Sequence, residues 1–254
     1  MSAEYFKYKD ILFPSVVFSE ESVSLAENDF PVLDDDVFNV TYPKSGTVWM
    51  IEILSLIRNN GDPTWSREVP NWNRVPWYEC VGAKEAAAKC PSTRMFTSHL
   101  PRQLFAKSFF NTKAKVIYTI RNPKDVLVSM YHYAQIATYM KTPSNFAELL
   151  QDFFADRVPF GSWFDHVQGW MEMKDKSKFF FITYEEMLED LRGCVVRISE
   201  FLGKELHEDA INAVVKNSSF ETMKNNDMSN YSKVPKEIMN KTKGQFLRKG
   251  EGVS

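Results

Sequence analysis

Residues 41–49, of sequence TYPKSGTVW, place a lysine, a glycine and hydroxyl side chains between an apolar run and a helical pattern. The preceding residues 37–40 suit a strand, and residues 50–57 repeat apolar side chains at helical spacing. Proteins bind phosphate at such a junction, because free amides at the helix start point at the anion and the helix dipole favours its charge. Gly46 allows close backbone approach and Lys44 supplies a positive charge. The loop therefore predicts an anion site, but alone it is also compatible with an ordinary polar turn, since the common nucleotide loop has a second glycine directly before the lysine.

A second junction of the same kind follows at Arg121, Asn122 and Pro123. Asn122 is a good N-cap and Pro123 a good first helical residue. Arg121 then stands at the end of a strand, where its planar guanidinium can hold a phosphate through two bonds. Ser129 lies about two turns into the predicted helix and, taken alone, is an incidental helix serine.

One histidine stands where catalysis is plausible. The chain has His99, His132, His166 and His207. An isolated histidine is more often structural than catalytic. His99 differs because it ends a predicted strand, at the edge of the sheet where α/β active sites gather. A pKa near neutral would suit it to accept a proton.

Short apolar runs alternate with longer helical patterns along the chain. The expected strands are residues 37–42, 94–98, 115–120 and 178–184, and the expected helices are residues 47–59, 123–139, 145–156, 162–173, 184–202 and 208–217. Two of the runs, at 115–120 and 178–183, are almost continuously apolar, as in parallel strands covered on both faces. The alternation predicts a single α/β domain over residues 1–254, with three α/β/α layers and a mainly parallel central sheet. Ligands are expected at the carboxyl ends of its strands.

Two segments lack a regular pattern. Residues 60–90 carry prolines and tryptophans with little periodicity, and so long an irregular stretch in a compact domain is typical of a binding loop. The three acids at 34–36 precede a strand, and we interpret them as a solvated turn rather than a metal site.

The composition is that of a globular protein large enough for one sizeable core: 254 residues, 44% apolar and 25% charged. The net charge of −2 argues against a nucleic-acid partner. The cysteines, Cys80, Cys90 and Cys194, form no CxxC pair, which suits a reducing compartment. The sequence shows neither a signal peptide nor an apolar run of the roughly 20 residues that span a bilayer. We therefore expect a cytosolic protein without membrane attachment.

Four segments together resemble the cytosolic sulfotransferases, which use 3′-phosphoadenosine 5′-phosphosulfate (PAPS) as donor. They are residues 41–49, 118–129 (YTIRNPKDVLVS), 160–166 (FGSWFDH) and 247–250 (LRKG), in the order of the family. The resemblance covers nearly all of the chain, and it implies a P-loop-like phosphate-binding loop. The donor-binding residues that it implies are Lys44, Ser45, Gly46, Thr47, Val48, Trp49, Arg121, Ser129, Tyr184, Ser218, Phe220, Met223, Arg248, Lys249 and Gly250.

The resemblance also implies how these residues share the donor. The 3′-phosphate would be bound by Arg121, Ser129 and the RKG tripeptide at 248–250. Trp49 would stack on adenine, with Phe220 opposite and Tyr184, Ser218 and Met223 lining the base pocket. Stacking of a base on an aromatic ring contributes roughly 1–3 kcal/mol. No acidic pair with metal spacing accompanies these residues, so protein cations rather than a metal ion are expected to neutralise the donor.

The reaction that the resemblance implies is in-line sulfuryl transfer, leaving adenosine 3′,5′-bisphosphate. His99 matches the catalytic histidine of the family and would accept the proton of the acceptor hydroxyl. Lys44 would stabilise the charge that grows on the bridging oxygen, as a donor fixed before the reaction.

The acceptor is less closely specified. Phenol-sulfating relatives have Lys-Thr-His before Leu-Pro, whereas residues 97–99 are Thr-Ser-His, which resembles the hydroxysteroid branch. Four aromatic residues would form an apolar wall for a rigid, small, hydroxylated acceptor, and these are Trp72, Trp77, Tyr133 and Tyr231. The same aromatics are also compatible with simple loop packing. We expect a steroid or similar alcohol, with phenols and amines as alternatives.

The sequence departs from the family at its end, where residues 248–254 are RKGEGVS. Members of the family continue through Gly-Asp-Trp-Lys-Asn and a terminal segment that forms the usual homodimer. The departure is expected to remove that dimer contact and to loosen the RKG clamp. A nucleotide-binding protein with little catalysis is therefore an alternative, and a nucleotide kinase is disfavoured by the absence of GxxxxGK spacing.

Overall fold

A central sheet of four parallel strands organises the chain in the computed structural model, which describes residues 4–90 and 93–248. The order of the strands is β4-β3-β5-β6. Their bounds are Val37–Thr41 for β3, Met95–Ser98 for β4, Lys115–Ile120 for β5 and Phe179–Thr183 for β6. In register, Thr41 pairs with Thr119 and Val40 with Ser98, so the carboxyl ends of β3, β4 and β5 meet at one edge. All four strands were predicted from the sequence.

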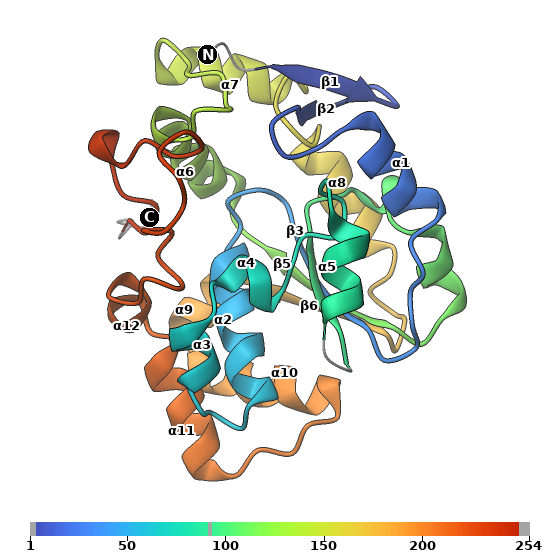
Figure 1. The fold of residues 1–254 in the computed structure, drawn as a ribbon, viewed down its shortest axis with the longest axis vertical. Helices are drawn as coiled ribbons and strands as arrows, with labels where there is room; N and C mark the ends of the chain where they lie inside the picture. Colours follow the sequence, from blue (N-terminus) through green and yellow to red (C-terminus); the bar gives the residue numbers. More distant parts are fainter. Residues whose placement is uncertain (1–3, 91–92, 249–254) are drawn as a thin grey trace.

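Helices cover both faces of this sheet (Figure 1). The main helices are α1 (Glu20–Asn28), α2 (Thr47–Arg58), α6 (Pro123–Ile136), α7 (Phe146–Phe154), α8 (Trp163–Met171), α9 (Tyr184–Glu189), α10 (Leu191–Leu202) and α11 (Glu208–Asn217). The shorter elements are α3 (Thr64–Glu68), α4 (Asn71–Arg74), α5 (Ala83–Lys89), α12 (Phe220–Lys224) and the 3-10 helices at Arg102–Leu104, Lys107–Asn111 and Lys241–Lys243. The predicted α/β/α architecture is confirmed.

Alternation along the strands divides the core into two halves. Phe38 and Tyr118 belong to an aromatic cluster that packs under α1 and α8, whereas Val37 and Ile117 pack against α2, α10 and α11. Successive side chains of a strand point to opposite faces, so one strand supplies both halves. Because both faces are covered, every residue of β3 is buried.

Two predictions about the elements were wrong, and one pair of strands was not anticipated. The helix expected over 184–202 is two helices, because Asp190 leaves the helical conformation and its carboxylate caps the second one by accepting from the Gly193 amide. The segment 60–90 contains three short helices, α3, α4 and α5. An antiparallel hairpin, β1 (Tyr5–Tyr8) with β2 (Ile11–Pro14), precedes α1 and was not anticipated.

The acidic turn at 34–36 also needs a correction. Asp34 and Asp35 are exposed as predicted, but Asp36 is fully buried and pairs with Arg94 at 2.6 Å. The pair ties the start of β3 to the start of β4. In the described ranges 4–90 and 93–248, no group of three or more acidic, histidine or cysteine side chains could hold a metal ion.

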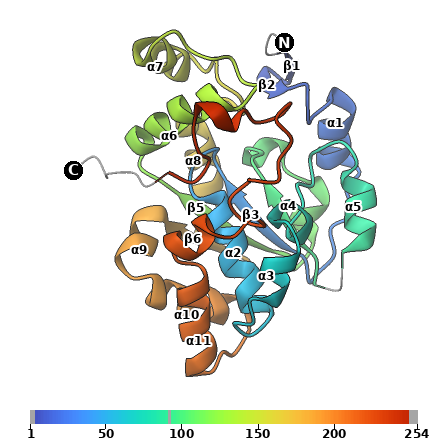
Figure 2. The ribbon, with the colours of Figure 1, turned by 60° about the vertical axis from the view of Figure 1, so that its left-hand side comes forward.

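The segment after α12 runs back across the molecule towards α6 (Figures 1 and 2). It pairs there through an isolated bridge between Ala137 and Met239, and the Asn240 amide donates to the Ile136 carbonyl at 2.7 Å. Residues 231–246 therefore lie beside the carboxyl end of α6. Within the described parts of the chain, no helix is both long and apolar enough to cross a bilayer.

Candidate active site

The loop between β3 and α2 has the geometry of an anion seat. Lys44 (φ 71°) and Gly46 (φ 99°) are left-handed, and Gly46 caps α2 without a side-chain hydrogen bond. A Cβ at Gly46 would lie 2.8 Å from the ring of Tyr184, so only glycine fits. Ser45 is buried, and its hydroxyl has no hydrogen-bond partner among the described residues. The start of α2 thus keeps donors available for a ligand.

Lys44 is held by aromatic rings. Its ammonium lies 3.8 Å from the ring centroid of Tyr133 and 4.6 Å from that of Phe246. Burial, with the nearby charge of Arg121, lowers the pKa of Lys44 to about 7. No ion pair to an acidic residue is found for Lys44 in the described ranges. Its charge is therefore available to an anion.

Arg121 joins the same seat from β5. Its guanidinium donates to the Lys44 carbonyl at 3.1 Å and lies 4.1 Å from the ring centroid of Tyr184. Its Nε is buried without a partner in the part of the chain that the structure describes. The two predicted basic junctions thus meet, because β3 and β5 are paired neighbours.

Two aromatic rings, those of Trp49 and Tyr184, lie edge to face beside these cations. The Trp49 indole donates to the Ser218 carbonyl at 2.9 Å, and its ring lies 5.2 Å from that of Tyr184. Val48, also in this first turn of α2, is buried in the core. Met223 is buried in α12, and Phe220 at the start of α12 contacts the ammonium of Lys224. Trp49, Tyr184 and Ser218 therefore lie together in the structure.

The predicted second phosphate clamp is only partly described. Ser129 lies on α6, one turn before the exposed His132. Burial and the charge of Arg248 lower the pKa of His132, so Arg248 lies near enough to act on the carboxyl-terminal part of α6. Lys249 and Gly250 lie outside the described residues.

His99 is tied to the strand that carries the phosphate loop. Its Nδ1 lies 2.7 Å from the Thr41 carbonyl and 3.2 Å from the Thr41 hydroxyl. A carbonyl only accepts hydrogen bonds, so Nδ1 carries the proton and Nε2 has the free lone pair. Thr41 also bonds to Thr47, the first residue of α2, at 2.7 Å. The base candidate and the anion seat are therefore one connected structure.

Both backbone groups of His99 are also fixed. Its amide donates to Glu79 at 2.8 Å, and its carbonyl accepts from His166 Nε2 at 3.1 Å. The Tyr118 hydroxyl donates to His166 Nδ1 at 2.8 Å, which sets the tautomer of that ring. The ring of Trp77 lies 4.4 Å from the His99 ring. The position of His99 is thus determined by a buried network.

The pKa of His99 is not near neutral in this structure. Burial, with the charges of His166 and Lys44, lowers the pKa of His99 to about 3, although its bond to Thr41 acts in the opposite direction. The imidazole is therefore neutral at physiological pH. Glu79, which the sequence did not single out, is fully buried, and burial raises its pKa to about 8. Nothing in the sequence around Glu79 indicates that it would accept the hydrogen bond of the His99 amide, because it is an isolated glutamate in a segment without a regular pattern.

The four aromatic residues predicted to contact the acceptor lie in two groups. Trp72 lies 5.5 Å from Tyr231, and Tyr231 stacks on Phe246 at 4.1 Å. Phe246 also lies 5.9 Å from Tyr133, which joins Tyr133 to this group. Trp77 stands apart, against His99. Phe246 was missed by the sequence analysis, although it lies two residues before the RKG tripeptide.

Comparison with known proteins decides the family. The family described as sulfotransferase domain matches residues 34–254. The chain belongs to the sulfotransferase family.

The relatives agree with this assignment. Sulfotransferase 2B1 of Mus musculus is 53% identical over 247 residues, covering 97% of this chain and 73% of the relative. The 3-beta-hydroxysteroid sulfotransferase of Cavia porcellus is 45% identical, covering 98% and 87%. The crystal structure of mouse sulfotransferase SULT7A1 complexed with PAP has a TM-score of 0.76 and 31% identity, covering 87% of this chain and 76% of that one. The predicted resemblance to the hydroxysteroid branch is confirmed.

The buried His166 gives this sulfotransferase a pH-dependent stability. Burial lowers the pKa of His166 from 6.5 to about 3, so between these pH values the unfolded chain binds a proton that the folded chain does not. Stability is therefore lost as the pH falls below 6.5. We expect the contribution of His166 to the free energy of unfolding to drop by about 2 kcal/mol between pH 7 and pH 5. Urea unfolding of the unmutated chain and of His166→Gln at both pH values checks this, and equal pH slopes would contradict it.

The lowered pKa of Lys44 gives anion binding a pH dependence. An anion beside Lys44 favours its charged form, so its pKa rises from about 7 on binding. At pH 8 the site is expected to take up about one proton when it binds adenosine 3′,5′-bisphosphate, and the affinity is expected to weaken as the pH rises above 7. Calorimetry in buffers of different ionisation enthalpy counts this proton. Lys44→Met is expected to abolish the uptake, and an unmutated site without uptake would refute the assignment.

Proposed function

We propose that this sulfotransferase transfers the sulfuryl group from PAPS to the hydroxyl of a small apolar acceptor, most favourably a steroid or similar alcohol. The observation that carries the proposal is the bond between His99 Nδ1 and the Thr41 carbonyl, at 2.7 Å. It leaves His99 Nε2 free to accept a proton while His99 stays fixed to the strand that ends in the anion seat.

The donor fits the chemistry of the seat. PAPS carries anionic groups at the 5′ and 3′ ends of one adenosine. The buried Ser45 hydroxyl and Arg121 Nε, without partners among the described residues, are donors that an anion would satisfy. We assign the 5′ end to the start of α2 and Lys44, adenine to Trp49 and Tyr184, and the 3′-phosphate to Arg121, Ser129 and residues 248–250. In this assignment the cations of the chain neutralise the donor.

The transfer itself breaks one bond and forms another. PAPS supplies a sulfuryl group whose bond to the 5′-phosphate oxygen breaks, and the electron pair leaves with adenosine 3′,5′-bisphosphate. His99 Nε2 takes the proton of the acceptor hydroxyl as its oxygen bonds to sulfur. Lys44 stabilises the negative charge that grows on the departing oxygen. The negative donor also favours the protonated imidazole, which offsets the low pKa of His99 in the free site.

The acceptor side supports an apolar alcohol. Trp72, Tyr231 and Phe246 form a contiguous aromatic surface, and Trp77 lies directly against His99. Such a surface fits rigid apolar rings, with the hydroxyl directed to the base. The 3-beta-hydroxysteroid sulfotransferase among the relatives supports the same class of acceptor.

We further propose one catalytic domain over residues 1–254, acting in the cytosol without nucleic-acid or membrane partners. The single parallel sheet and the near-neutral net charge support this. The three cysteines are free thiols, as in a reducing compartment.

Replacing His99 separates catalysis from binding. His99→Ala is expected to reduce single-turnover transfer from labelled PAPS by at least about a hundredfold, because general-base catalysis contributes on that order. The dissociation constant of adenosine 3′,5′-bisphosphate is expected to stay nearly unchanged. His207→Ala, an exposed histidine before α11, is the matched control. Normal turnover by His99→Ala would refute the assignment of His99 as the base. An unmutated chain that binds the bisphosphate but transfers no sulfuryl group would refute the proposal that it is an enzyme.

Acceptor choice is tested on two hydroxyl compounds. We expect a higher kcat/KM for dehydroepiandrosterone than for 4-nitrophenol, because the aromatic wall buries more of the rigid four-ring alcohol. Steady-state rates at saturating PAPS measure both values. A higher kcat/KM for 4-nitrophenol would contradict the proposed alcohol acceptor and favour a phenol acceptor instead.

A further inference from the structure

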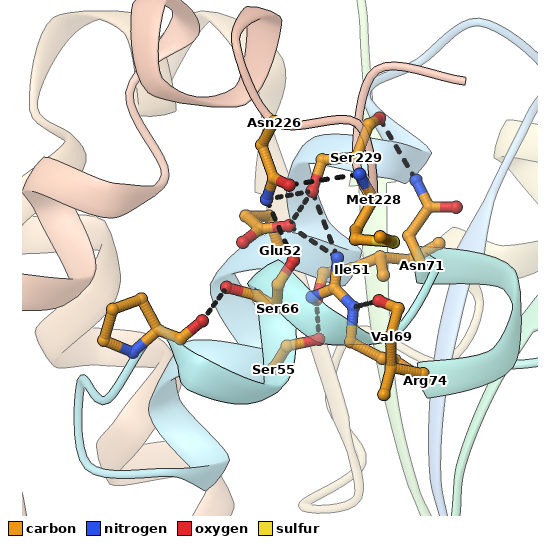
Figure 3. Close-up of polar contacts among 11 residues, drawn as sticks. Ile51, Glu52, Ser55, Ser66, Val69, Asn71, Arg74, Asn226, Met228 and Ser229 are labelled. Atoms are coloured by element: carbon orange, nitrogen blue, oxygen red, sulfur yellow. Dashed lines mark hydrogen bonds and ion pairs between the residues drawn. The ribbon is translucent and has the colours of Figure 1, made fainter. Parts of the chain in front are cut away.

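A buried polar triad, Glu52, Arg74 and Ser229, lies beside the site but outside the chemistry described above (Figure 3). The exposed fractions of the three residues are 1%, 2% and 0%. Arg74 Nη2 lies 2.7 Å from Glu52 Oε2 and 3.1 Å from the Ser229 hydroxyl, and that hydroxyl donates to Glu52 Oε2 at 2.6 Å. Each member therefore contacts the other two.

The triad joins three segments that are distant in sequence. Glu52 belongs to α2, Arg74 to α4, and Ser229 to the segment after α12. Asn71 of α4 reinforces the junction, since its amide donates to the Met228 carbonyl at 2.9 Å and its side chain to the Ser229 carbonyl at 3.3 Å.

Each triad residue is close in sequence to a residue of the proposed site. Glu52 lies one turn after Trp49 on α2, so it shares the helix whose first turn forms the anion seat. Arg74 lies between Trp72 and Trp77. Ser229 lies two residues before Tyr231. The helix of the donor seat and two of the chain segments of the acceptor wall are thus linked through the same three side chains.

Net stabilisation alone does not account for such a cluster. A buried ion pair loses its hydration, and apolar residues of similar volume often serve stability equally well. The hydrogen bonds of an arginine fork are directional, however, and they fix distances that apolar contacts leave adjustable.

We propose that Glu52, Arg74 and Ser229 are positioning residues that set the acceptor wall relative to the donor helix and thereby determine which acceptors fit. This inference rests on the proposed function for the identity of the two ligands. Loss of the Ser229 hydroxyl would remove the direct bond between residues 226–231 and α2. Asn71 would still tie these residues to α4, and Tyr231 would shift relative to the donor seat. Rigid acceptors that span the wall would then bind more weakly, whereas the donor seat at the start of α2 would keep its geometry.

Ser229→Ala is the sharpest variant, because Glu52 and Arg74 stay directly paired. We expect the dissociation constant of dehydroepiandrosterone, followed by tryptophan fluorescence with adenosine 3′,5′-bisphosphate bound, to rise about tenfold. That of the bisphosphate, measured by calorimetry, is expected to change less than twofold. The ratio of kcat/KM for dehydroepiandrosterone to that for 1-butanol is expected to fall about tenfold as well. Ser229→Thr, which keeps the hydroxyl, is expected to restore this ratio.

Ser199→Ala is the matched control, since Ser199 is a buried serine of α10 that bonds to its own helix. It is expected to leave both dissociation constants and the ratio unchanged. An unchanged ratio in Ser229→Ala, or an equal weakening of both ligands, would overturn the positioning role. An unmutated chain that transfers sulfuryl to no alcohol would instead refute the proposed function, and the two dissociation constants would still test the triad.

Discussion

The bond between the His99 imidazole and the Thr41 carbonyl is the interaction on which the site depends. Parallel pairing of β3 with β4 places Val40 beside Ser98, so Thr41 at the end of β3 lies beside His99, the residue that follows β4. The Thr41 hydroxyl also contacts that of Thr47, and the proposed base is thereby connected to the first turn of α2, the helix of the proposed donor seat. The distance between the proposed base and the anion seat is therefore set by two paired strands, which hold their relative position more rigidly than a loop would.

Burial controls the protonation of this site in the absence of ligand. The pKa values of His99 and Lys44 are both lowered, because each would carry a positive charge in an environment poor in water and close to other cations. An anionic donor would reverse that balance, since it would offer each group an opposite charge. Without ligand, His99 and Lys44 therefore lack a compensating negative charge among the described residues. Binding of the anionic donor would supply this charge, and His99 would then become an effective base.

The sequence predicted the elements whose signals are local and missed those that depend on contacts. The strands around Val37 and Lys115 and the junctions at Gly46 and Asn122 follow from apolar runs, glycine and caps. Burial of Asp36 could not be read from an acidic tripeptide, because its partner Arg94 lies far along the chain. The contacts of Glu79 with His99 and of Phe246 with Lys44 could not be predicted for the same reason, since only the folded chain brings these residues together.

The acceptor wall depends on side-chain contacts between separate segments more than the donor seat does. The seat is built on the first turn of one helix and the ends of paired strands, so the backbone pairing of the sheet sets its geometry. The wall combines α4, α6 and residues 231–246, which touch mainly through aromatic rings and the isolated bridge at Met239. Aromatic stacking tolerates sliding, and a wall built only in this way would accept many shapes. The directional bonds of Arg74 are what limit that freedom, because they tie two of the three wall segments to the helix of the seat.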